Sequence, residues 1–446
     1  MTRLARYILC VILLLCATIS ASAQGSLNKT ERTAIATKLQ SITLPDVAGS
    51  YVKVKDVRIR KRKVEVKASV ELAYYPMRKE SIKRIYDSVR SALPEKYRNY
   101  SLEIYADGTL IDNLIPHYYD ANHTTKAFRY SDVTPLISRT SELSQPTHGL
   151  QHRHIALWQS HGRYYKNVVG EWRWQRSCLW ETVEDLYTQS YVIPYLLPML
   201  ERAGANVLLP RERSMRTEEV IIDNDNGISS ALYRETSSTE AWSDAGVGFA
   251  HLYDTYPTGH NPFVDGTARM VATSTTEATA TATWGGTIPA AGTYTLYISY
   301  ASLPNSVSDA HYTVHASGGE HTFSVNQRMG GAMWIALGEF YFEAGEHDTL
   351  VTLSNYSAEH GVVSADAVKI GGGMGNIRRS TPEVDSLAEE RTSGYPRFTE
   401  GARYWLQWSG FPTSVYAPKE STDDYKEDYM SRAHWVNYLK IGRAHV

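Results

Sequence analysis

Residues 219–373 are the part of the sequence that most narrows the possible folds. Ser, Thr, Gly and Ala dominate this stretch, basic residues become rare, and the periodicity of an amphipathic helix disappears. Short β-type runs recur instead between turn signals, at residues 279–284, 293–300, 311–315, 321–326, 334–342, 349–353 and 366–370. Short strands at such regular spacing predict an all-β sandwich.

Several short motifs inside this stretch resemble the golvesin/xanthan-lyase-type carbohydrate-binding-like domain. They are GTYTLY at 292–297, Gln327, WIALG at 334–338, Phe342 and ADAVKIGGG at 365–373. The resemblance implies a β-sandwich and, because such sandwiches often bind glycans, a carbohydrate ligand. Trp242, Trp284 and Trp334 are candidate sugar platforms, but a Trp at a strand centre is more often core packing than a platform.

A strand–helix–strand pattern precedes the sandwich. The apolar run at 155–159 ends in Ser160-His161-Gly162, and Glu184 follows His161 by 23 positions (184 − 161) at the start of a helical segment. That segment leads through Gly204 to a short strand at 206–210. Since the carboxyl ends of parallel strands open onto the cleft of an α/β fold, we expect His161 and Glu184 on one rim. Imidazole and carboxylate, with one more ligand and a water, make a catalytic zinc set. The alternative is a strand-end His and a solvated Glu.

Residues 155–213 resemble the first third of the zinc-dependent N-acetylmuramoyl-L-alanine amidases, which cleave peptidoglycan. The matching pieces are Ser160-His161-Gly162, Glu184, LERAGA at 200–205 and Arg211. The resemblance implies that His161 and Glu184 hold zinc and that a zinc-activated water attacks the amide bond. Arg211 and Arg213 are then expected to contact a substrate carboxylate or lactyl group, unless they only cap the strand exit.

The chain departs from the amidase pattern in several places. Ser160 stands where Gly is usual, and a long aromatic insert, 164–180, separates the two expected ligands. Pro194 and Pro198 interrupt the helix, where each removes a backbone hydrogen bond. Glu181 and Asp185 lie close enough to Glu184 for the ligand assignment to move by one turn. The third zinc ligand and the catalytic base cannot be assigned.

Length and composition set the broad class of the protein. A chain of 446 residues predicts several domains, and a formal net charge of −2 argues against general nucleic-acid binding. Residues 1–23 have the features of a secretory signal peptide, whose apolar run is too short to span a membrane. We expect release of the mature protein rather than lipid anchoring at Cys16. Cys178 then remains alone, so no internal disulfide is expected.

The domain organisation follows from these patterns. Residues 25–145 predict a small α/β domain, with a hairpin over 51–60 and 64–74, a helix at 80–93, and strands at 102–105 and 110–115. Residues 150–218 form the first part of an incomplete amidase-like α/β domain, into which the sandwich at 219–373 is inserted. Residues 395–440 return to that domain and bring Trp405 and Trp435 to it.

The final residues, 441–446, match the translation of a common sequencing adapter and are suspected to be an artefact, in which His445 is no ligand. We therefore expect a C-terminally truncated fragment that lacks the third zinc ligand and the catalytic base and is inactive. The leading function is an exported zinc-dependent amidase, periplasmic or extracellular, that cleaves the N-acetylmuramoyl-L-alanine bond and carries an accessory glycan-binding sandwich. The alternative is a non-catalytic secreted or surface carbohydrate-binding protein with a degenerate amidase scaffold. The expected partner is peptidoglycan or another cell-envelope glycan.

Overall fold

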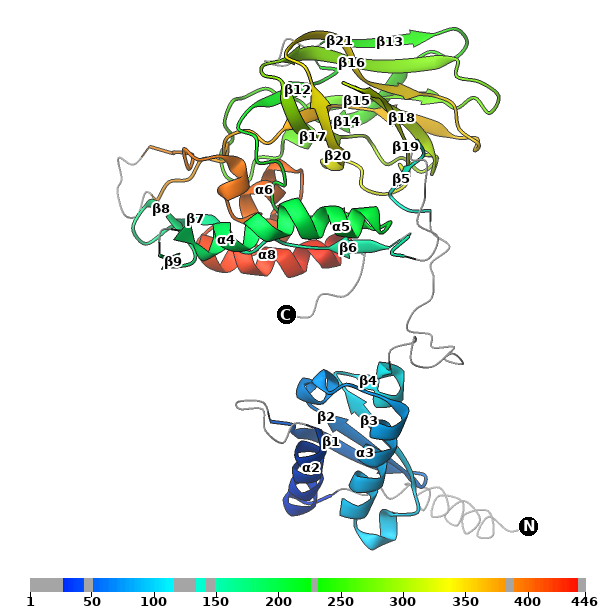
Figure 1. Ribbon diagram of the computed structural model, residues 1–446, viewed down its shortest axis with the longest axis vertical. Coiled ribbons are helices and arrows are strands. Elements are labelled where there is room, and N and C mark those ends of the chain that lie inside the picture. The colour runs from blue at the N-terminus through cyan, green and yellow to red at the C-terminus, as the bar shows by residue number, and fades with distance from the viewer. Residues whose placement is uncertain are drawn as a thin grey trace, which may run out of the picture. The chain divides into compact units, whose positions relative to one another are not determined.

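The computed structural model describes residues 27–43, 51–115, 134–141, 149–151, 153–180, 182–225, 232–381 and 389–439. The chain divides into two compact units, Met1–Asp132 and Val133–Val446 (Figure 1). The predicted signal peptide at 1–23, Glu181, and residues 441–446 lie outside the described residues. Within the described ranges, no helix is long and apolar enough to cross a membrane.

The first unit is a small α/β fold built on a four-stranded sheet in the order β1-β2-β3-β4. Its strands are β1 (Val54–Arg60), β2 (Lys63–Ala68), β3 (Ser101–Ala106) and β4 (Thr109–Leu110), and its helices are α2 (Lys29–Thr43) and α3 (Lys79–Ala92). β2 is antiparallel to β1 and parallel to β3. The alternate residues Val64 and Val66 are buried in the same continuous core as Ile85 and Val89 of α3.

The predicted hairpin is confirmed, with a two-residue turn at Lys61 and Arg62 in which both φ angles are positive. Two of the predicted strands are too long. β2 ends at Ala68 and is followed by a 3-10 helix at Val70–Tyr74, and β4 ends before a 3-10 helix at Ile111–Leu114. Short apolar runs satisfy a strand and a helical turn equally well, so periodicity could not separate them.

The predicted β-sandwich is confirmed in the second unit. It contains a six-stranded sheet, β13-β16-β21-β18-β19-β5, in which β5 is Ile137–Arg139, a four-stranded sheet, β12-β23-β17-β20, and a three-stranded sheet, β14-β15-β22. The strands are β12 (Glu219–Ile222), β13 (Leu232–Ser237), β14 (Ser243–Gly248), β15 (Gly266–Ala272), β16 (Ala280–Ile288), β17 (Gly292–Ile298), β18 (Ala310–Ala316), β19 (Gly319–Val325), β20 (Ile335–Phe342), β21 (Gly345–Ser354), β22 (Val362–Ala365) and β23 (Val368–Gly371). All pairings between these strands are antiparallel.

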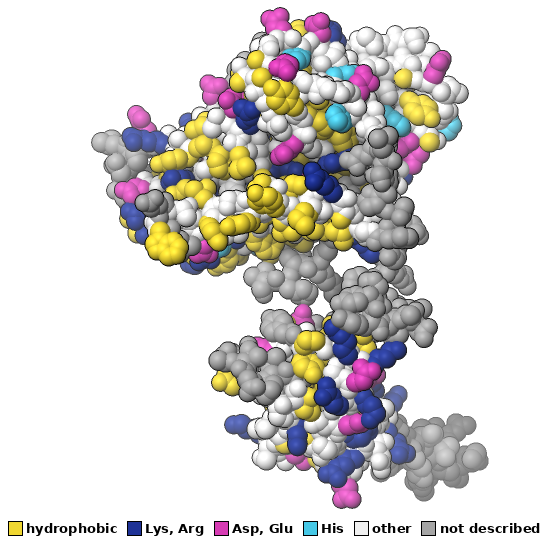
Figure 2. All heavy atoms as spheres, viewed as in Figure 1, with side chains coloured by type: hydrophobic (Ala, Val, Ile, Leu, Met, Phe, Trp, Pro, Cys, Tyr) yellow, Lys and Arg dark blue, Asp and Glu magenta, His cyan; other side chains and the backbone are white. Residues whose placement is uncertain are grey.

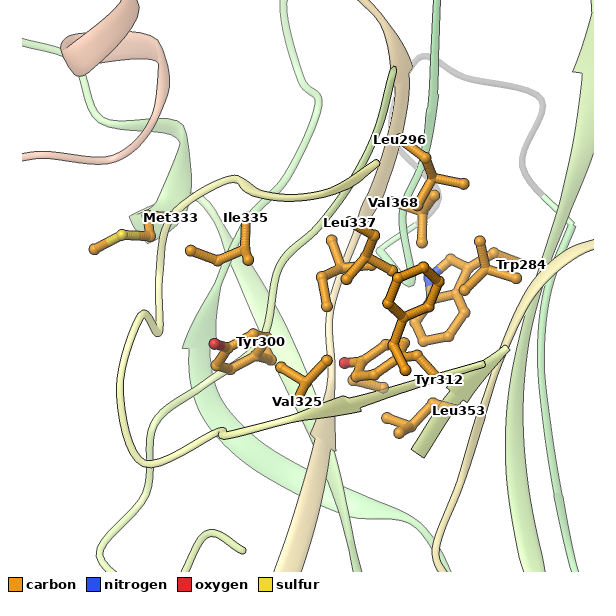
Figure 3. Close-up of a cluster of buried hydrophobic side chains, with 14 of the residues drawn as sticks. Trp284, Leu296, Tyr300, Tyr312, Val325, Met333, Ile335, Leu337, Leu353 and Val368 are labelled. Atoms are coloured by element: carbon orange, nitrogen blue, oxygen red, sulfur yellow. The ribbon is translucent and has the colours of Figure 1, made fainter. Parts of the chain in front are cut away.

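The sandwich core combines aromatic and aliphatic side chains (Figure 3). Trp284 is fully buried, stacks near Tyr312 with a centroid separation of 6.4 Å, and donates its indole N–H to the Asp366 carbonyl over 2.9 Å. Trp242 and Trp334 are also buried. These three tryptophans therefore pack the interior, and none of them presents a sugar platform at the surface.

One edge strand of the sandwich comes from a segment that the sequence placed in the first domain. β5 (Ile137–Arg139) pairs antiparallel with β19, and Leu136 enters the sandwich core. The predicted first domain reached residue 145, whereas the first compact unit ends at Asp132. A three-residue strand whose partner lies far along the chain has no local signal, because its pairing is decided by the edge that it covers.

The α/β part of the second unit is centred on two short parallel strands, β6 (His154–Ala156) and β11 (Asn206–Leu208). They are joined through α4 (Glu184–Tyr191), a π-helical turn at Val192–Leu196 that contains Pro194, and α5 (Leu197–Arg202). Ile155 and Val207 pack toward Ile193 and Leu197, while Ala156 and Leu208 pack on the opposite side against the large core. Both faces of this small sheet are thus covered, as parallel strands require.

Residues after 395 return to the α/β part as α6 (Ala402–Trp408), α7 (Thr413–Tyr416) and α8 (Asp424–Leu439). The Tyr404 hydroxyl donates a hydrogen bond to Asp424 and accepts one from the Tyr165 backbone N–H over 2.7 Å. Trp435 joins the core against which Leu208 packs, and Trp405 contacts Tyr297 of the sandwich with a centroid separation of 5.6 Å. The returning helices therefore cover the face of β6 and β11 opposite to α5, and not the Ile193 and Leu197 face.

Candidate functional site

The loop after β6 carries Ser160, His161 and Gly162 into a crowded position between β11 and α6. Ser160 has φ +80°, a left-handed conformation that a residue with a side chain adopts at a cost and that is frequent at functional sites. A Cβ on Gly162 would lie 2.7 Å from the carbonyl carbon and oxygen of Glu400, so only Gly fits there. The backbone around His161 is therefore fixed by close packing.

Two arginines flank the His161 ring. The Arg432 guanidinium Nη2 lies 2.9 Å from His161 Nδ1, and Arg176 Nη2 lies 2.6 Å from His161 Nε2. Burial lowers the pKa of His161 to about 4, and the positive charges of Arg432 and Arg176 act in the same direction. The imidazole is therefore neutral at physiological pH.

Arg432 is held rigidly by an acidic partner on its own helix. Its Nη2 donates to Asp428 Oδ2 over 2.5 Å, one turn earlier on α8, and both side chains are buried. Asp428 also accepts from Gln175 Nε2 over 2.7 Å and from the Arg403 backbone N–H over 3.2 Å. Burial alone would raise the pKa of Asp428, but Arg432 and Gln175 hold it below its ordinary value. The pair is thus ionised and fixed in place.

Asp185, and not Glu184, is the acidic residue beside His161. The Glu184 side chain is exposed, whereas Asp185 is fully buried. Asp185 accepts from Ser160 Oγ over 3.3 Å and from the backbone N–H groups of Arg176 and His161. Burial raises the pKa of Asp185, and its Oδ2 has no partner among the described residues. The helix begins at Glu184 as predicted, but its first residue points to solvent.

These residues do not fit a zinc ion. Zinc needs the lone pair of a ring nitrogen, and each nitrogen of His161 faces a guanidinium that carries a positive charge. The expected second ligand, Glu184, is turned outward. In the described part of the chain, no group of three or more His, Cys, Asp and Glu residues could hold a metal ion. Zinc coordination by His161 and Glu184 stays a prediction that this geometry does not support.

Arg211 and Arg213, the expected substrate contacts, both line a cavity of about 130 Å³ between the α/β part and the sandwich. Arg211 is buried and donates to the backbone carbonyls of Glu400, Phe398 and Gln159 over 2.7, 2.8 and 3.2 Å. Arg213 makes a bidentate ion pair with Glu201 at 2.7 and 3.1 Å. The structure gives both arginines a positioning role, and their contact with substrate stays a prediction.

Two exposed tryptophans belong to this loop and to the hairpin that follows the aromatic insert. Trp180 is 99% exposed at the tip of a hairpin formed by β9 (Cys178–Leu179) and β10 (Thr182–Val183), and Trp158 in the loop after β6 is 42% exposed. The hairpin is fastened at its base, because Glu184 N donates to the Ser177 carbonyl over 3.4 Å and the Arg176 N–H donates to Asp185. Strands of two residues extend about 7 Å, so Trp180 lies within a short reach of the base of this hairpin.

A row of tyrosines continues this aromatic surface along the helix. Tyr187, Tyr191 and Tyr195 are each more than half exposed and recur every four residues, and Met199 follows them. The rings of Tyr187 and Tyr191 meet edge to face with centroids 5.2 Å apart. Figure 2 shows hydrophobic side chains gathered across the face that carries α4 and α5. We name Trp158, Trp180, Tyr187, Tyr191 and Tyr195 the aromatic rim.

Sequence reasoning missed Arg176 and Arg432 and named Asp185 only as an alternative to Glu184. Arg432 meets His161 across 271 residues (432 − 161), a separation at which a single sequence carries no signal. Arg176 lies within the aromatic insert at 164–180, which the sequence did single out. That insert forms the hairpin of β7 (Arg163–Lys166) and β8 (Glu171–Trp174), followed by β9.

Comparison with known proteins identifies part of the second unit. Residues 260–372 match the Golvesin C-terminal domain. Among solved structures, a xanthan lyase from Paenibacillus is similar over 35% of this chain and 13% of its own, at 25% identity and a TM-score of 0.26. The C-terminal CBM6 of LamC from Zobellia galactanivorans is similar over 34% of this chain and 99% of its own, at 11% identity and a TM-score of 0.21. A GH26-CBM35 mannanase from Podospora anserina is similar over 35% and 28%, at 18% identity and a TM-score of 0.21. No curated protein matches the chain.

Proposed function

We propose that this chain is an exported, glycan-binding protein and that its α/β part serves as a binding scaffold rather than as a zinc amidase. The observation that carries the proposal is Trp180, whose indole is 99% exposed at the tip of a hairpin fastened beside His161. Leaving so large an apolar side chain in water forgoes about 2–3 kcal/mol of burial energy. Such a side chain is well suited to a ligand with an apolar face, and the C–H face of a pyranose ring is one.

The rest of the aromatic rim extends this platform. Four residues of an α-helix rise about 6 Å, which separates Tyr187 from Tyr191 on α4 by roughly the length of one sugar, and Tyr195 follows in the π-helical turn. Tyr187, Tyr191 and Tyr195 are therefore placed to contact neighbouring sugars, and each ring also offers a hydroxyl to a polar ligand. A glycan chain on this helix would meet Trp180 at one end of the row.

The family resemblance of the sandwich supports an extracellular glycan-binding role. Residues 219–373 resemble carbohydrate-binding-like sandwiches, and residues 260–372 match the Golvesin C-terminal domain. Because Trp242, Trp284 and Trp334 are all buried, we place the aromatic contacts on the α/β part and not on these residues. The proposed partner is peptidoglycan or another glycan of the cell envelope.

The test is co-sedimentation of the whole chain with insoluble glycans, peptidoglycan among them. Replacing Trp180 by Ala should weaken binding by about tenfold or more, the usual effect of removing a central Trp from an interface. Since Trp180 contacts solvent over nearly all its surface, the melting temperature should not change. The matched control is Tyr341→Ala, which removes an exposed aromatic side chain from β20 of the sandwich.

Two results would contradict the proposal. The first is that the chain sediments with none of the glycans. The second is that Tyr341→Ala abolishes binding while Trp180→Ala leaves it intact, since this would place the glycan on the sandwich.

A further inference from the structure

The hydrogen bonds around His161 leave one ring nitrogen without a suitable partner. A neutral imidazole has one N–H donor and one acceptor nitrogen, and an arginine side chain can only donate. Arg432 is fixed by its ion pair with Asp428, so its Nη2 donates to His161 Nδ1 over 2.9 Å. Nδ1 is therefore the acceptor, and the network assigns the ring proton to Nε2.

This assignment leaves two donors facing each other. His161 Nε2–H points at Arg176 Nη2 over 2.6 Å, and the guanidinium cannot accept a hydrogen bond. Arg176 Nε has no partner among the described atoms either. An acceptor oxygen placed between the ring and the guanidinium would satisfy both donors, and Arg176 is only half-buried, in the loop between β8 and β9.

We propose that His161 and Arg176 form a subsite for the carboxylate of an acidic polysaccharide, with Arg176 moving outward to admit it. The inference rests on the glycan-binding function proposed above and names the class of glycan. One carboxylate oxygen accepts from His161 Nε2–H, and the other accepts from the Arg176 guanidinium. The planar guanidinium matches a planar carboxylate, and hydrogen bonds of this charged kind are among the strongest in proteins.

The charges around the subsite favour an anion over a neutral hydroxyl. Arg432 is balanced by Asp428, whereas the described residues place no carboxylate within ion-pair distance of the Arg176 guanidinium. Asp185 accepts from Ser160 and from backbone N–H groups. A bound carboxylate therefore neutralises Arg176. Trp180 follows four residues later and is 99% exposed, so in this proposal its indole stacks on the sugar that carries the carboxylate.

The test compares acidic polysaccharides with their own neutral forms. Polygalacturonate, alginate and hyaluronate are each used intact and after reduction of the carboxyl groups to alcohols, and dextran sulfate is compared with dextran. Binding to the whole chain is measured by affinity electrophoresis at one fixed ionic strength, because screening changes any charge contribution. The variants are Arg176→Gln, Arg176→Lys and Trp180→Ala. The control is Arg173→Gln, which removes an exposed arginine paired with Glu171 on β8.

We expect at least one acidic polysaccharide to bind about tenfold more tightly than its reduced form, as one charged hydrogen-bond pair provides. Arg176→Gln should bring that ratio close to one, Arg176→Lys should keep part of it, and Arg173→Gln should leave it unchanged. A ratio near one in the unmodified protein, or one that survives in Arg176→Gln, would overturn the subsite. A preference seen only with dextran sulfate would overturn its assignment to a carboxylate.

The same data separate the subsite from the proposed function. If acidic and reduced forms bind equally and Trp180→Ala weakens both, the glycan platform stands and the carboxylate subsite is wrong. If no polysaccharide binds in either form, the carboxylate subsite is wrong. If the chain also fails to sediment with peptidoglycan, the glycan-binding function fails with it.

Discussion

Lys369 and Glu212 form an ion pair of 2.9 Å in which both side chains are fully buried. Lys369 lies on β23 of the sandwich, and Glu212 follows β11 of the α/β part, so the pair joins the two folds at their interface. Tyr297 of β17 donates its hydroxyl to Glu212, and the Ser214 backbone N–H donates to the same carboxylate over 2.8 Å. Burial lowers the pKa of Lys369, and the charge of Glu212 opposes this effect.

Replacing Lys369 by Met should therefore destabilise the second unit. The variant leaves the Glu212 carboxylate buried without its cation, which costs about 3–5 kcal/mol. Adding Glu212→Gln to Lys369→Met should recover part of the loss, because the buried charge is then gone. Chemical denaturation followed by fluorescence measures both changes. If Lys369→Met alone is as stable as the unmodified protein, the two folds do not depend on this ion pair.

Gly162→Ala should disturb the loop that holds His161. The new methyl group would lie 2.7 Å from the Glu400 carbonyl and 2.8 Å from Gly401 N, and neither backbone group can move aside freely. Overpacking of this kind costs about 1–3 kcal/mol, and it should weaken glycan binding together with the melting temperature. Gly286→Ala is the control, because its methyl group would meet the Ile222 side chain at 3.4 Å and the Val220 side chain at 3.7 Å, both ordinary contacts. Equal stability of the two variants would contradict the packing described for Gly162.

Asp223 should make the sandwich less stable as the pH rises toward neutrality. Burial, and then the nearby Asp225 carboxylate, raise the pKa of Asp223 from 3.8 to about 7. Between these values the folded protein keeps a proton that the unfolded chain has released, so stability falls as pH rises from about 4 to about 7. Within this window the free energy of unfolding falls by up to about 4 kcal/mol, and outside it Asp223 adds no pH dependence.

The measurement is thermal unfolding of Asp223→Asn and of the unmodified protein across that range. The variant should gain stability relative to the unmodified protein with each step in pH, and Asp348→Asn, at an exposed position of β21, should show no such trend. A constant difference between Asp223→Asn and the unmodified protein at every pH would mean that Asp223 does not hold its proton in the folded state.

Removing metal ions should leave glycan binding unchanged. In this structure Nδ1 of His161 accepts from Arg432 and its Nε2 faces Arg176, so neither nitrogen offers a lone pair to a metal. Co-sedimentation with and without EDTA, and calorimetric titration with zinc, check this directly. Zinc bound in a one-to-one ratio and lost in His161→Ala would restore the predicted metal site.

The sandwich could be predicted because its signal is local. Short strands, turn residues and ordered sequence matches between residues 219 and 373 specify antiparallel sheets without knowledge of the pairing. β5 could not be found this way, since Ile137–Arg139 becomes a strand only by covering the edge of β19. The limits of β2 and β4 failed for a different reason, because a short apolar run suits both a strand and a 3-10 turn.

The candidate site could be predicted only in part. The strand–helix–strand pattern located His161 and the helix start. It could not decide which side chain at that helix start faces inward, because neighbouring residues on a helix point in different directions. Asp185 therefore faces the cluster while Glu184 faces solvent. Arg432 reaches His161 from α8 only after the returning segment has packed on β6 and β11, and no pattern within either segment anticipates this contact.

The most direct test of the central claim follows binding and cleavage in one experiment. The whole chain is incubated with purified peptidoglycan, the bound fraction is sedimented, and new L-alanine amino groups are counted in the same sample. A binding scaffold predicts that protein accumulates on the glycan, that Trp180→Ala reduces this accumulation, and that no new amino groups appear. Release of L-alanine amino groups that is lost in His161→Ala would contradict the account and establish the amidase.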